Sequence, residues 1–297
     1  MIVDNTSQAP ANRRGMLLMI ASMACFTFAD LFLKFASEFV TTGQITLVLG
    51  LGGTLMFWAM LKRKGETVFS SFFWEVPVLL RTGGEIVATI FIILALTYAS
   101  FTGVAVILQT LPLLLTLCSF IFLKERVGVL RLTAILAGFG GMLLIVRPGS
   151  DGFDAYSLLA IMAVIGMTMR DFGSRMVGEH VSSERLAIFG TFAQIVVGVV
   201  FMAFEESHAI PSVTIAFYLL GMVVFANLAI LLVTYAMRIG EVSAISPFRY
   251  SRLFFAMIIG IVVLGETVEL NMIIGSAIII VAGLFVWMRE RKALISQ

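Results

Sequence analysis

Charged residues are scarce in this chain of 297 residues, where Asp, Glu, Lys and Arg together make up 13%. Soluble domains carry about 25% charged residues. Hydrophobic residues account for 60% of the chain, and the mean hydropathy is +1.06. So few charges cannot cover a water-exposed surface of this size. The composition therefore excludes an ordinary soluble protein and indicates a polytopic membrane protein.

Cysteine and histidine are also scarce, with two of each. Cys25 and Cys118 lie in apolar runs, so no disulfide framework is indicated. His180 and His208 are expected in loops, and no His, Cys or Glu cluster has the spacing of metal ligands. A phosphate-binding Gly-x-x-x-x-Gly-Lys-Ser/Thr loop is missing as well. We therefore predict no enzyme, no cofactor and no ATP-driven pump.

Long apolar runs dominate the chain, and segments of about 20 residues span a bilayer as helices. We predict ten membrane spans at about 16–36, 43–61, 78–98, 103–123, 129–147, 155–176, 185–204, 212–237, 243–264 and 270–288. The first of them follows Arg13-Arg14, as a signal peptide does. It contains Asp30 and Lys34, however, and a similar segment recurs in mid-chain, so we interpret it as a membrane span.

The distribution of Lys and Arg predicts the orientation, because these residues collect in cytoplasmic loops. With ten spans and a cytoplasmic N-terminus, all but four of the 20 fall on the cytoplasmic side. The exceptions are Lys34 and Arg147 on the outer side, and Arg249 and Arg252 within the ninth span. Both termini are therefore predicted to be cytoplasmic, in a multi-pass protein of the bacterial inner membrane.

A charged pattern occurs twice at a spacing of 141 residues. The recurring pairs are Thr27/Thr168, Asp30/Asp171, Lys34/Arg175, Glu38/Glu179 and Glu125/Glu266. Tyr98 and Tyr235 recur at a spacing of 137, so the two halves differ slightly in length. Five spans per half place the second copy upside down relative to the first, as in carriers built from inverted repeats.

Several short motifs resemble the EamA repeat of the drug/metabolite transporter superfamily. They are Leu123-Lys124-Glu125-Arg126, Leu264-Gly265-Glu266, Ala137-Gly138-Phe139-Gly140-Gly141, Arg147-Pro148-Gly149 and the stretch Ala244-Ile245-Ser246-Pro247-Phe248-Arg249-Tyr250-Ser251-Arg252-Leu253. The resemblance covers about residues 13–290. It implies ten helices in two inverted five-helix units, a central cavity and transport without ATP hydrolysis. The Asp-x-x-x-Lys in the first span and the Pro-Phe-Arg-Tyr in the ninth resemble a subgroup of riboflavin and S-adenosylmethionine carriers.

The duplicated charges are the first candidate functional residues. Asp30 and Lys34 are one helical turn apart, as are Asp171 and Arg175, so each pair is able to meet on its own helix. One interpretation is simple neutralisation near a membrane interface. The other is a pair of gates, one at each mouth of the carrier, that exchange partners with other helices during the transport cycle.

A second set of candidates lies deeper in the spans. Arg249 and Arg252, which flank Tyr250, share a helix face after Pro247 and offer a doubly positive patch, unless they reach to the lipid headgroups instead. The other embedded polar residues that we select are Arg81, Glu85, Tyr98, Gln109 and Tyr235. For Glu85 we consider two roles, a proton carrier and a counter-ion of Arg81 or Arg249. Gln109 is the first choice for a hydrogen-bond donor in the cavity.

These observations predict a secondary active transporter of a small polar metabolite that works by alternating access. We expect a cytoplasmic tail at 1–14, the repeats at 15–150 and 151–290, and a second tail at 291–297. A riboflavin-like, S-adenosylmethionine-like or amino-acid-like solute is the expected partner, besides the lipid bilayer, and no nucleic acid is expected. A homodimer is compatible with the sequence. The alternatives are an exporter of amino-acid-like metabolites, a passive channel and a membrane-embedded transferase.

Overall fold

The computed structural model of this chain describes residues 5–66, 74–122, 128–147, 154–177, 181–206, 212–239 and 245–295. Within these ranges all regular structure is helical. In chain order the helices are α1 (Asn5–Ser37), α2 (Thr42–Lys64), α3 (Val76–Tyr98), α4 (Phe101–Leu108), α5 (Leu111–Phe122), α6 (Val129–Val146), α7 (Ser157–Met176), α8 (Ser183–Phe204), α9 (Val213–Ile239), the 3₁₀ helix η2 (Ser246–Tyr250), α11 (Ser251–Val262) and α12 (Leu270–Ile295). The first and last helices extend into both of the expected tails.

The helices form the ten predicted crossings. In the described ranges, nine helical segments are long and apolar enough to span a membrane, and α4 with α5 counts as one of them, from Phe101 to Phe122. The remaining crossing consists of η2 and the 12-residue α11. Pro247 stands at the start of η2, where its fixed φ and missing N–H favour a short 3₁₀ turn. Ile245, before η2, is also helical, and the residues directly before it lie outside the described ranges; at the other end α11 stops at Val262, two residues before the predicted end.

Local signals in the sequence explain where α2 begins and ends. The Thr41 side chain accepts from the Gln44 N–H, and the Gln44 side chain accepts from the Thr41 N–H, which forms a capping box. At the other end Gly65 adopts a left-handed conformation with φ of 71°, which glycine tolerates best. Lys62, Arg63 and Lys64 occupy the last turn, so this helix ends in a basic group at the membrane surface.

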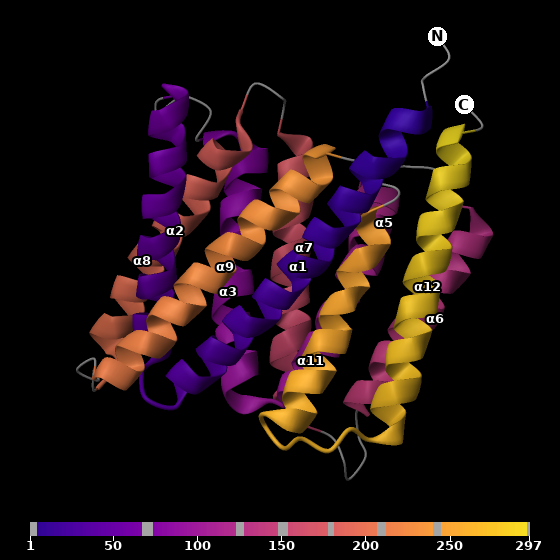
Figure 1. The fold of residues 1–297 in the computed structure, drawn as a ribbon. Helices are drawn as coiled ribbons and strands as arrows, with labels where there is room; N and C mark the ends of the chain where they lie inside the picture. Colours follow the sequence, from indigo (N-terminus) through magenta and orange to yellow (C-terminus); the bar gives the residue numbers. More distant parts are fainter. Residues whose placement is uncertain are drawn as a thin grey trace.

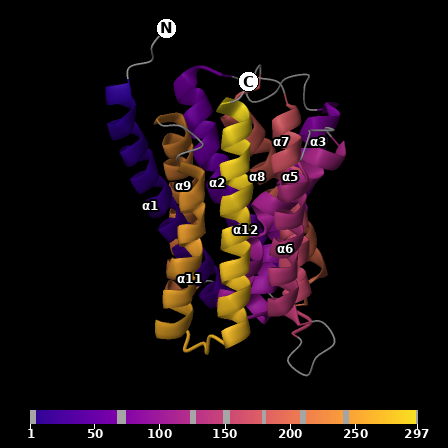
Figure 2. The same cartoon turned by 90° about the vertical axis from the view of Figure 1, so that its right-hand side faces the viewer.

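The two halves of the chain have the same order of helices. Adding 141 to the bounds of α2, 42–64, gives 183–205, and α8 spans Ser183–Phe204. The same addition to the bounds of α6, 129–146, gives 270–287, which lies within α12. Both termini lie at one end of the bundle (Figures 1 and 2), as an even number of crossings requires. We call this end, where α2 ends and α3 begins, the terminal end, and the opposite one the far end.

The packing of the helices also reflects the correspondence between the two halves. The α1 helix packs against α9 and α3 packs against α7, so each of these pairs is the counterpart of the other. The α2 helix packs against its own counterpart α8, and α6 packs against its own counterpart α12. Figure 2 shows α6 and α12 side by side at the edge of the bundle. The first half therefore binds the second through three pairs of long helices around the centre, with α6 and α12 as a separate outer pair.

Glycines allow the central helices to approach closely. A Cβ on Gly84 of α3 would overlap the backbone nitrogen of Arg170 and lie 2.8 Å from the carbonyl oxygen of Gly166 on α7. A Cβ on Gly166 would in turn overlap the backbone nitrogen of Ala88. Small residues at such crossings are typical of membrane helix pairs, because packing rather than the hydrophobic effect holds helices together in lipid.

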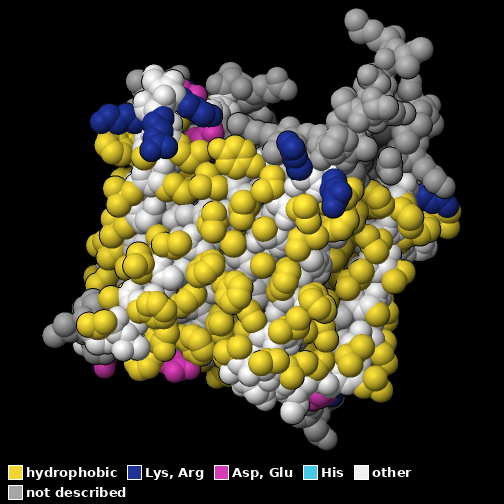
Figure 3. Space-filling view, viewed as in Figure 1, with side chains coloured by type: hydrophobic (Ala, Val, Ile, Leu, Met, Phe, Trp, Pro, Cys, Tyr) yellow, Lys and Arg dark blue, Asp and Glu magenta, His cyan; other side chains and the backbone are white. Residues whose placement is uncertain are grey.

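The surface has the distribution of polar groups that a membrane protein requires. Figure 3 shows a broad band of hydrophobic side chains, with most of the visible Lys and Arg along the edge at the terminal end and acidic groups at both ends. Exposed basic residues of the terminal end include Arg13, Arg14, Lys62, Arg63, Lys64 and Arg289. Glu38, Glu206 and Glu269 are exposed at the far end.

The buried core is continuous at the far end and divided at the terminal end. The largest hydrophobic cluster unites far-end residues of eight helices, among them Leu33, Ile45, Leu96, Phe101, Val164, Met222 and Ile259. At the terminal end, one cluster around Phe57 joins α2, α3 and α8, and a second around Met19 joins α1, α9 and the residue before η2. A third cluster, around Leu113 and Ile135, joins α5, α6 and α12. The far end is therefore sealed by one cluster, whereas the core at the terminal end is split among three.

Candidate functional site

A cavity of about 470 Å³ lies at the centre of the bundle, within the range of about 300–1,000 Å³ that is usual for small-molecule sites. It is lined by residues of α1, α2, α3, α4, α5, α7, α8, α9, η2 and α11. From the middle of the membrane it extends toward the terminal end, as far as Arg81, Ser174 and Ala187, which lie within about two turns of their helix ends. The continuous far-end cluster closes its other side.

Asp30 of α1 and Arg252 of α11 form an ion pair across the cavity wall. An Arg252 guanidinium nitrogen donates to a carboxylate oxygen of Asp30 at 2.5 Å, and both side chains are largely buried, at 16% and 14% exposure. The guanidinium carbon also lies 5.4 Å from the centre of the Phe26 ring. The pair therefore joins the two halves of the chain, and Asp30 has its counter-ion on another helix rather than in Lys34.

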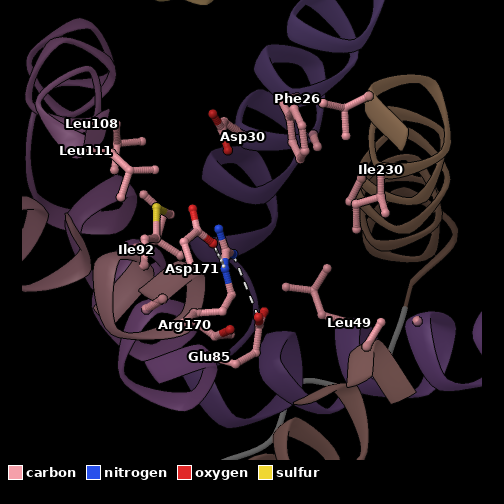
Figure 4. A pocket seen from close by; sticks show the side chains of 18 of the residues that line it. Phe26, Asp30, Leu49, Glu85, Ile92, Leu108, Leu111, Arg170, Asp171 and Ile230 are labelled. Carbon is pink, nitrogen blue, oxygen red and sulfur yellow. Dashed lines mark hydrogen bonds and ion pairs between the residues drawn. The ribbon is translucent and has the colours of Figure 1, made fainter. Parts of the chain in front are cut away.

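Arg170 of α7 is the centre of a second charged group on the opposite wall. Its Nε donates to the Asp171 carboxylate at 2.8 Å, and a terminal nitrogen lies 3.7 Å from the Glu85 carboxylate of α3. In Figure 4 these three side chains lie together in the cavity, below Asp30 and opposite Ile230. One guanidinium thus lies between two carboxylates and reduces the repulsion between them, which is strong in a medium of low dielectric constant.

Gln194 of α8 attaches this group to a third helix. Its amide nitrogen donates to the Glu85 carboxylate at 3.1 Å and to the Thr89 hydroxyl at 2.6 Å. Gln194 is buried, and hydrogen bonds of this kind hold membrane helices together because lipid offers no other partner. Glu85 is therefore paired with Arg170 in this conformation, whereas Arg81 or Arg249 was the partner expected from the sequence.

The two remaining arginines of the cavity differ in their partners. Arg81 of α3 donates to the backbone carbonyl oxygen of Leu186 at 2.5 Å, close to the start of α8. Arg249 lies at the end of η2 and lines the cavity, but it forms neither a hydrogen bond nor an ion pair within the part of the chain that the structure describes. It is near enough to Asp171 and Arg170 to interact with both electrostatically.

A break in the fourth crossing places a polar group at the cavity. Helix α4 ends at Leu108, α5 begins at Leu111, and the N–H groups of Gln109 and Thr110 make tight bonds to the carbonyls three residues before them. Gln109 is 6% exposed and lines the cavity, and its amide nitrogen has no hydrogen-bond partner among the described residues. A buried donor without a partner is costly, so a bound solute that accepts from it would gain affinity.

Lys34 and Glu266 hold the turn between α3 and α4 at the far end. The ammonium group of Lys34 donates to the carbonyls of Leu96 and Ala99, at 3.0 and 3.1 Å, where α3 ends. The Glu266 carboxylate accepts from the N–H groups of Phe101 and Thr102, at 2.5 and 2.9 Å, where α4 begins. A cation at a helix C-terminus and an anion at a helix N-terminus both complement the helix dipole. We call this arrangement the far-end clamp.

Of the twelve residues selected from the sequence, seven line the cavity: Asp30, Arg81, Glu85, Gln109, Asp171, Arg249 and Arg252. Lys34 lies below it in the far-end clamp. Tyr98 and Tyr235 are 57% and 56% exposed and do not line the cavity, and the Tyr98 ring stacks on Tyr156. The Arg175 side chain lies outside the described part of the structure.

Tyr250 also lies away from the cavity lining. Its hydroxyl is buried without a partner among the described residues, and it packs over α12, where an added Cβ on Gly283 would collide with it. Glu179, Glu125 and the two histidines fall outside the described residues. In the described ranges there is no group of three His, Cys, Asp or Glu side chains able to hold a metal ion.

The sequence analysis did not select Arg170, Gln194 or Glu266 as site residues. Arg170 stands in an apolar run directly before Asp171, so the same criterion of an embedded charge would have identified it. The repeat pattern did not mark Arg170 as a candidate, because the equivalent position in the first half is Ala29. The role of Glu266 depends on contact with α4, 164 residues earlier in the chain, and only the fold shows that contact.

Comparison with known proteins places the chain among transporters. The profile of the EamA-like transporter family matches residues 13–147 and 155–288, one match in each half. Over 190 residues the chain is 27% identical to a riboflavin transporter of Vibrio cholerae, a match that covers 64% of this chain and 63% of that protein. A riboflavin transporter of Brucella anthropi is 28% identical over 211 residues, covering 67% and 71% of the two chains.

A further relative and a solved structure complete the comparison. An S-adenosylmethionine uptake transporter of Rickettsia bellii is 24% identical over 200 residues, covering 67% of this chain and 68% of that protein. A crystal structure superposes with a TM-score of 0.64 over 94% of this chain and 98% of its own, at 17% identity. At that identity the superposition supports the fold alone.

Proposed function

Because this chain belongs to the EamA-like transporter family, and is therefore a transporter and not an enzyme, we propose that it moves a small polar metabolite across the bacterial inner membrane by alternating access. The central cavity is the transport site in this proposal. The cycle is secondary transport without ATP hydrolysis, in which the two halves rock about the cavity.

The observation that carries the proposal is the unequal closure of the two ends. A continuous cluster from eight helices seals the far end, while the core at the terminal end is divided and the cavity reaches toward it. A carrier that has opened to one side has this form, whereas a channel needs a path open to both sides. The inverted repeat supplies the alternative state, because exchanging the roles of the halves would seal the terminal end instead.

We propose that both termini are cytoplasmic and that the conformation described here faces the cytoplasm. The basic side chains that gather at the terminal end support this orientation. In that orientation Glu206 and Glu269 face outward, and the solute leaves or enters the cavity from the cytoplasmic side.

The far-end clamp has the position of an outer gate in this cycle. Glu266 follows α11 in the second half, and it holds the start of α4 in the first half. Opening the far end requires the halves to separate there, so the bonds from Glu266 to Phe101 and Thr102 must break or move. Asp30 and Lys34, which were proposed as one gate, therefore take part in two separate contacts. Asp30 binds Arg252 in the cavity, and Lys34 binds the end of α3.

The relatives suggest the type of solute. Those named above are riboflavin and S-adenosylmethionine transporters, and both solutes combine a flat ring system with polar groups. We propose a solute of comparable size, which a cavity of about 470 Å³ accommodates. An exporter of amino-acid-like metabolites is the second candidate, favoured by the presence of both carboxylates and guanidinium groups in the cavity.

The test begins with purified full-length protein and a thermal-shift screen of metabolites, followed by uptake of each hit into liposomes with and without a pH gradient. A carrier is expected to show saturable uptake and countertransport, in which unlabelled solute on one side accelerates the exit of labelled solute from the other. Flux that rises linearly with concentration and shows no countertransport would identify a channel and refute the proposal.

A further inference from the structure

The charged side chains that line the cavity are not balanced. The lining carries four guanidinium groups, of Arg81, Arg170, Arg249 and Arg252, against three carboxylates, of Asp30, Glu85 and Asp171. A spare positive charge at this depth is costly unless a partner or water compensates for it. The composition of the lining therefore leaves room for one negative charge.

Each carboxylate of the lining is already bonded to an arginine. Asp30 binds Arg252, and Arg170 binds both Asp171 and Glu85. Gln194 adds a hydrogen bond to Glu85. A cationic solute would have to displace an arginine to reach any of these oxygens, so the cavity offers no ready site for a positive group.

Arg249 is the arginine of the lining whose guanidinium group has no bonded partner among the described residues. Arg81 is held by the Leu186 carbonyl, whereas Arg249 forms no hydrogen bond or ion pair within the described ranges. It ends a 3₁₀ turn and faces the cavity from the side of the second half. An arginine in this position presents several donors in a fixed plane, which suits a carboxylate or a phosphate.

The remaining wall of the cavity is mainly apolar, with Asn227 of α9 as a polar residue in it. Figure 4 shows Phe26, Leu49 and Ile230 on the side opposite the Arg170 group. The wall continues through other apolar lining residues, namely Met23, Ala29, Leu33, Met222, Ala226 and Val233. An apolar ring system is able to pack on the apolar part of such a wall. Between the two walls, Gln109 supplies a buried donor without a partner.

We propose that the transported solute is an amphipathic anion, with a flat or apolar body and one carboxylate or phosphate that binds Arg249. The proposal rests on the cavity being the transport site, as set out above. It separates this chain from the relatives, because riboflavin is uncharged and S-adenosylmethionine carries a net positive charge near neutral pH.

Two matched pairs of compounds test the sign of the charge. Riboflavin 5′-phosphate differs from riboflavin by a phosphate, and S-adenosylhomocysteine differs from S-adenosylmethionine by the loss of a cationic methyl group. We expect purified parent protein in nanodiscs to bind riboflavin 5′-phosphate at least about tenfold more tightly than riboflavin, which is the effect of one charge-assisted hydrogen bond. S-adenosylhomocysteine is expected to bind more tightly than S-adenosylmethionine, because both carry the carboxylate but only the latter adds a sulfonium charge that the spare arginine repels. Equal affinity within both pairs, tighter binding of the cationic or neutral members, or no binding of either more negative member would overturn the proposal.

Variants of Arg249 then assign the preference to this residue. Arg249→Gln is expected to reduce the ratio within each pair to about one, and Arg249→Lys to keep part of it, since the charge is retained. Arg63→Gln removes the same charge at an exposed position outside the cavity and is expected to keep the full ratio. A preference that survives Arg249→Gln would refute the assignment. Countertransport of any solute by the same preparations tests the proposed function separately. If the parent protein shows countertransport but no charge preference, this inference alone is overturned.

Discussion

The carboxylate of Asp30 and the guanidinium of Arg252 meet at 2.5 Å, although 222 residues separate them in the chain. One belongs to α1 of the first half and the other to α11 of the second, so their ion pair crosses the boundary between the repeats. The position equivalent to Arg252 in the first half is Leu111, and no symmetric copy of the pair exists. The bond is therefore specific to one side of the cavity, although Asp30 itself is duplicated as Asp171.

Removal of one member of this pair is expected to destabilise the protein more than removal of both. Asp30→Asn leaves a buried guanidinium without its counter-ion, and such uncompensated charges cost about 3–5 kcal/mol. The double variant Asp30→Asn/Arg252→Gln leaves no net charge, so its thermal midpoint in detergent should lie above that of at least one single variant. Additive losses in the double-mutant cycle would show that the two side chains contribute independently.

Adjacent glycines of α3 provide a matched test of helix packing. In Gly84→Ala the new methyl group meets the backbone of α7, so we expect a large loss of thermal stability and of folded protein in the membrane. Gly83→Ala is the control, because a Cβ at that position has no neighbour within 4 Å. It should be neutral or slightly stabilising, since alanine favours helix over glycine by about 1 kcal/mol. Equal stability of the two variants would contradict the close α3–α7 contact.

Weakening the far-end clamp should favour the outward-open state. In Glu266→Gln we expect the side chain at position 266 to hold the start of α4 less strongly. A neutral amide oxygen accepts weaker hydrogen bonds from the N–H groups of Phe101 and Thr102 than a carboxylate does. The measurement is labelling of an Ile92→Cys reporter in the cavity by an impermeant reagent from the outer side, after both native cysteines have been replaced by serine. Faster labelling is expected in Glu266→Gln.

The control for this experiment is Glu206→Gln, which removes the same charge from an exposed position at the far end. Its labelling rate should equal that of the reporter alone. If both variants label at the reporter's rate, the clamp is a structural brace and not a gate.

Cysteine accessibility also tests the orientation. In a background without native cysteines, a cysteine in place of Glu206 should react with an impermeant reagent on intact cells. A cysteine in place of Arg63 should react only after permeabilisation, because most of the basic residues gather at that end. The reverse pattern would place the termini outside and make the conformation described here outward-facing.

Much of the fold follows from the sequence, because a helix in lipid must satisfy its backbone hydrogen bonds internally and present apolar side chains along about 20 residues. That constraint acts on consecutive residues, so the apolar runs, the charged breaks and the duplicated Asp30 and Asp171 were enough to predict ten crossings in two inverted halves. The ninth crossing was harder to predict in detail, since it contains a 3₁₀ turn at Pro247 that the apolar pattern does not show.

Partners of the buried charges could not be read from the sequence in the same way. One-turn spacing made Lys34 the nearest partner of Asp30, yet a cation on another helix and the end of α3 proved to be the respective partners. Local spacing fixes only which side chains share a helix face. Which of them meet depends on how α1, α3, α7 and α11 pack, and on the high cost of leaving any charge unpaired in the membrane. The sequence therefore determined the class, the topology and the embedded charges, whereas the tertiary structure alone decided that Arg170 would contact two carboxylates and that Arg249 would face the cavity.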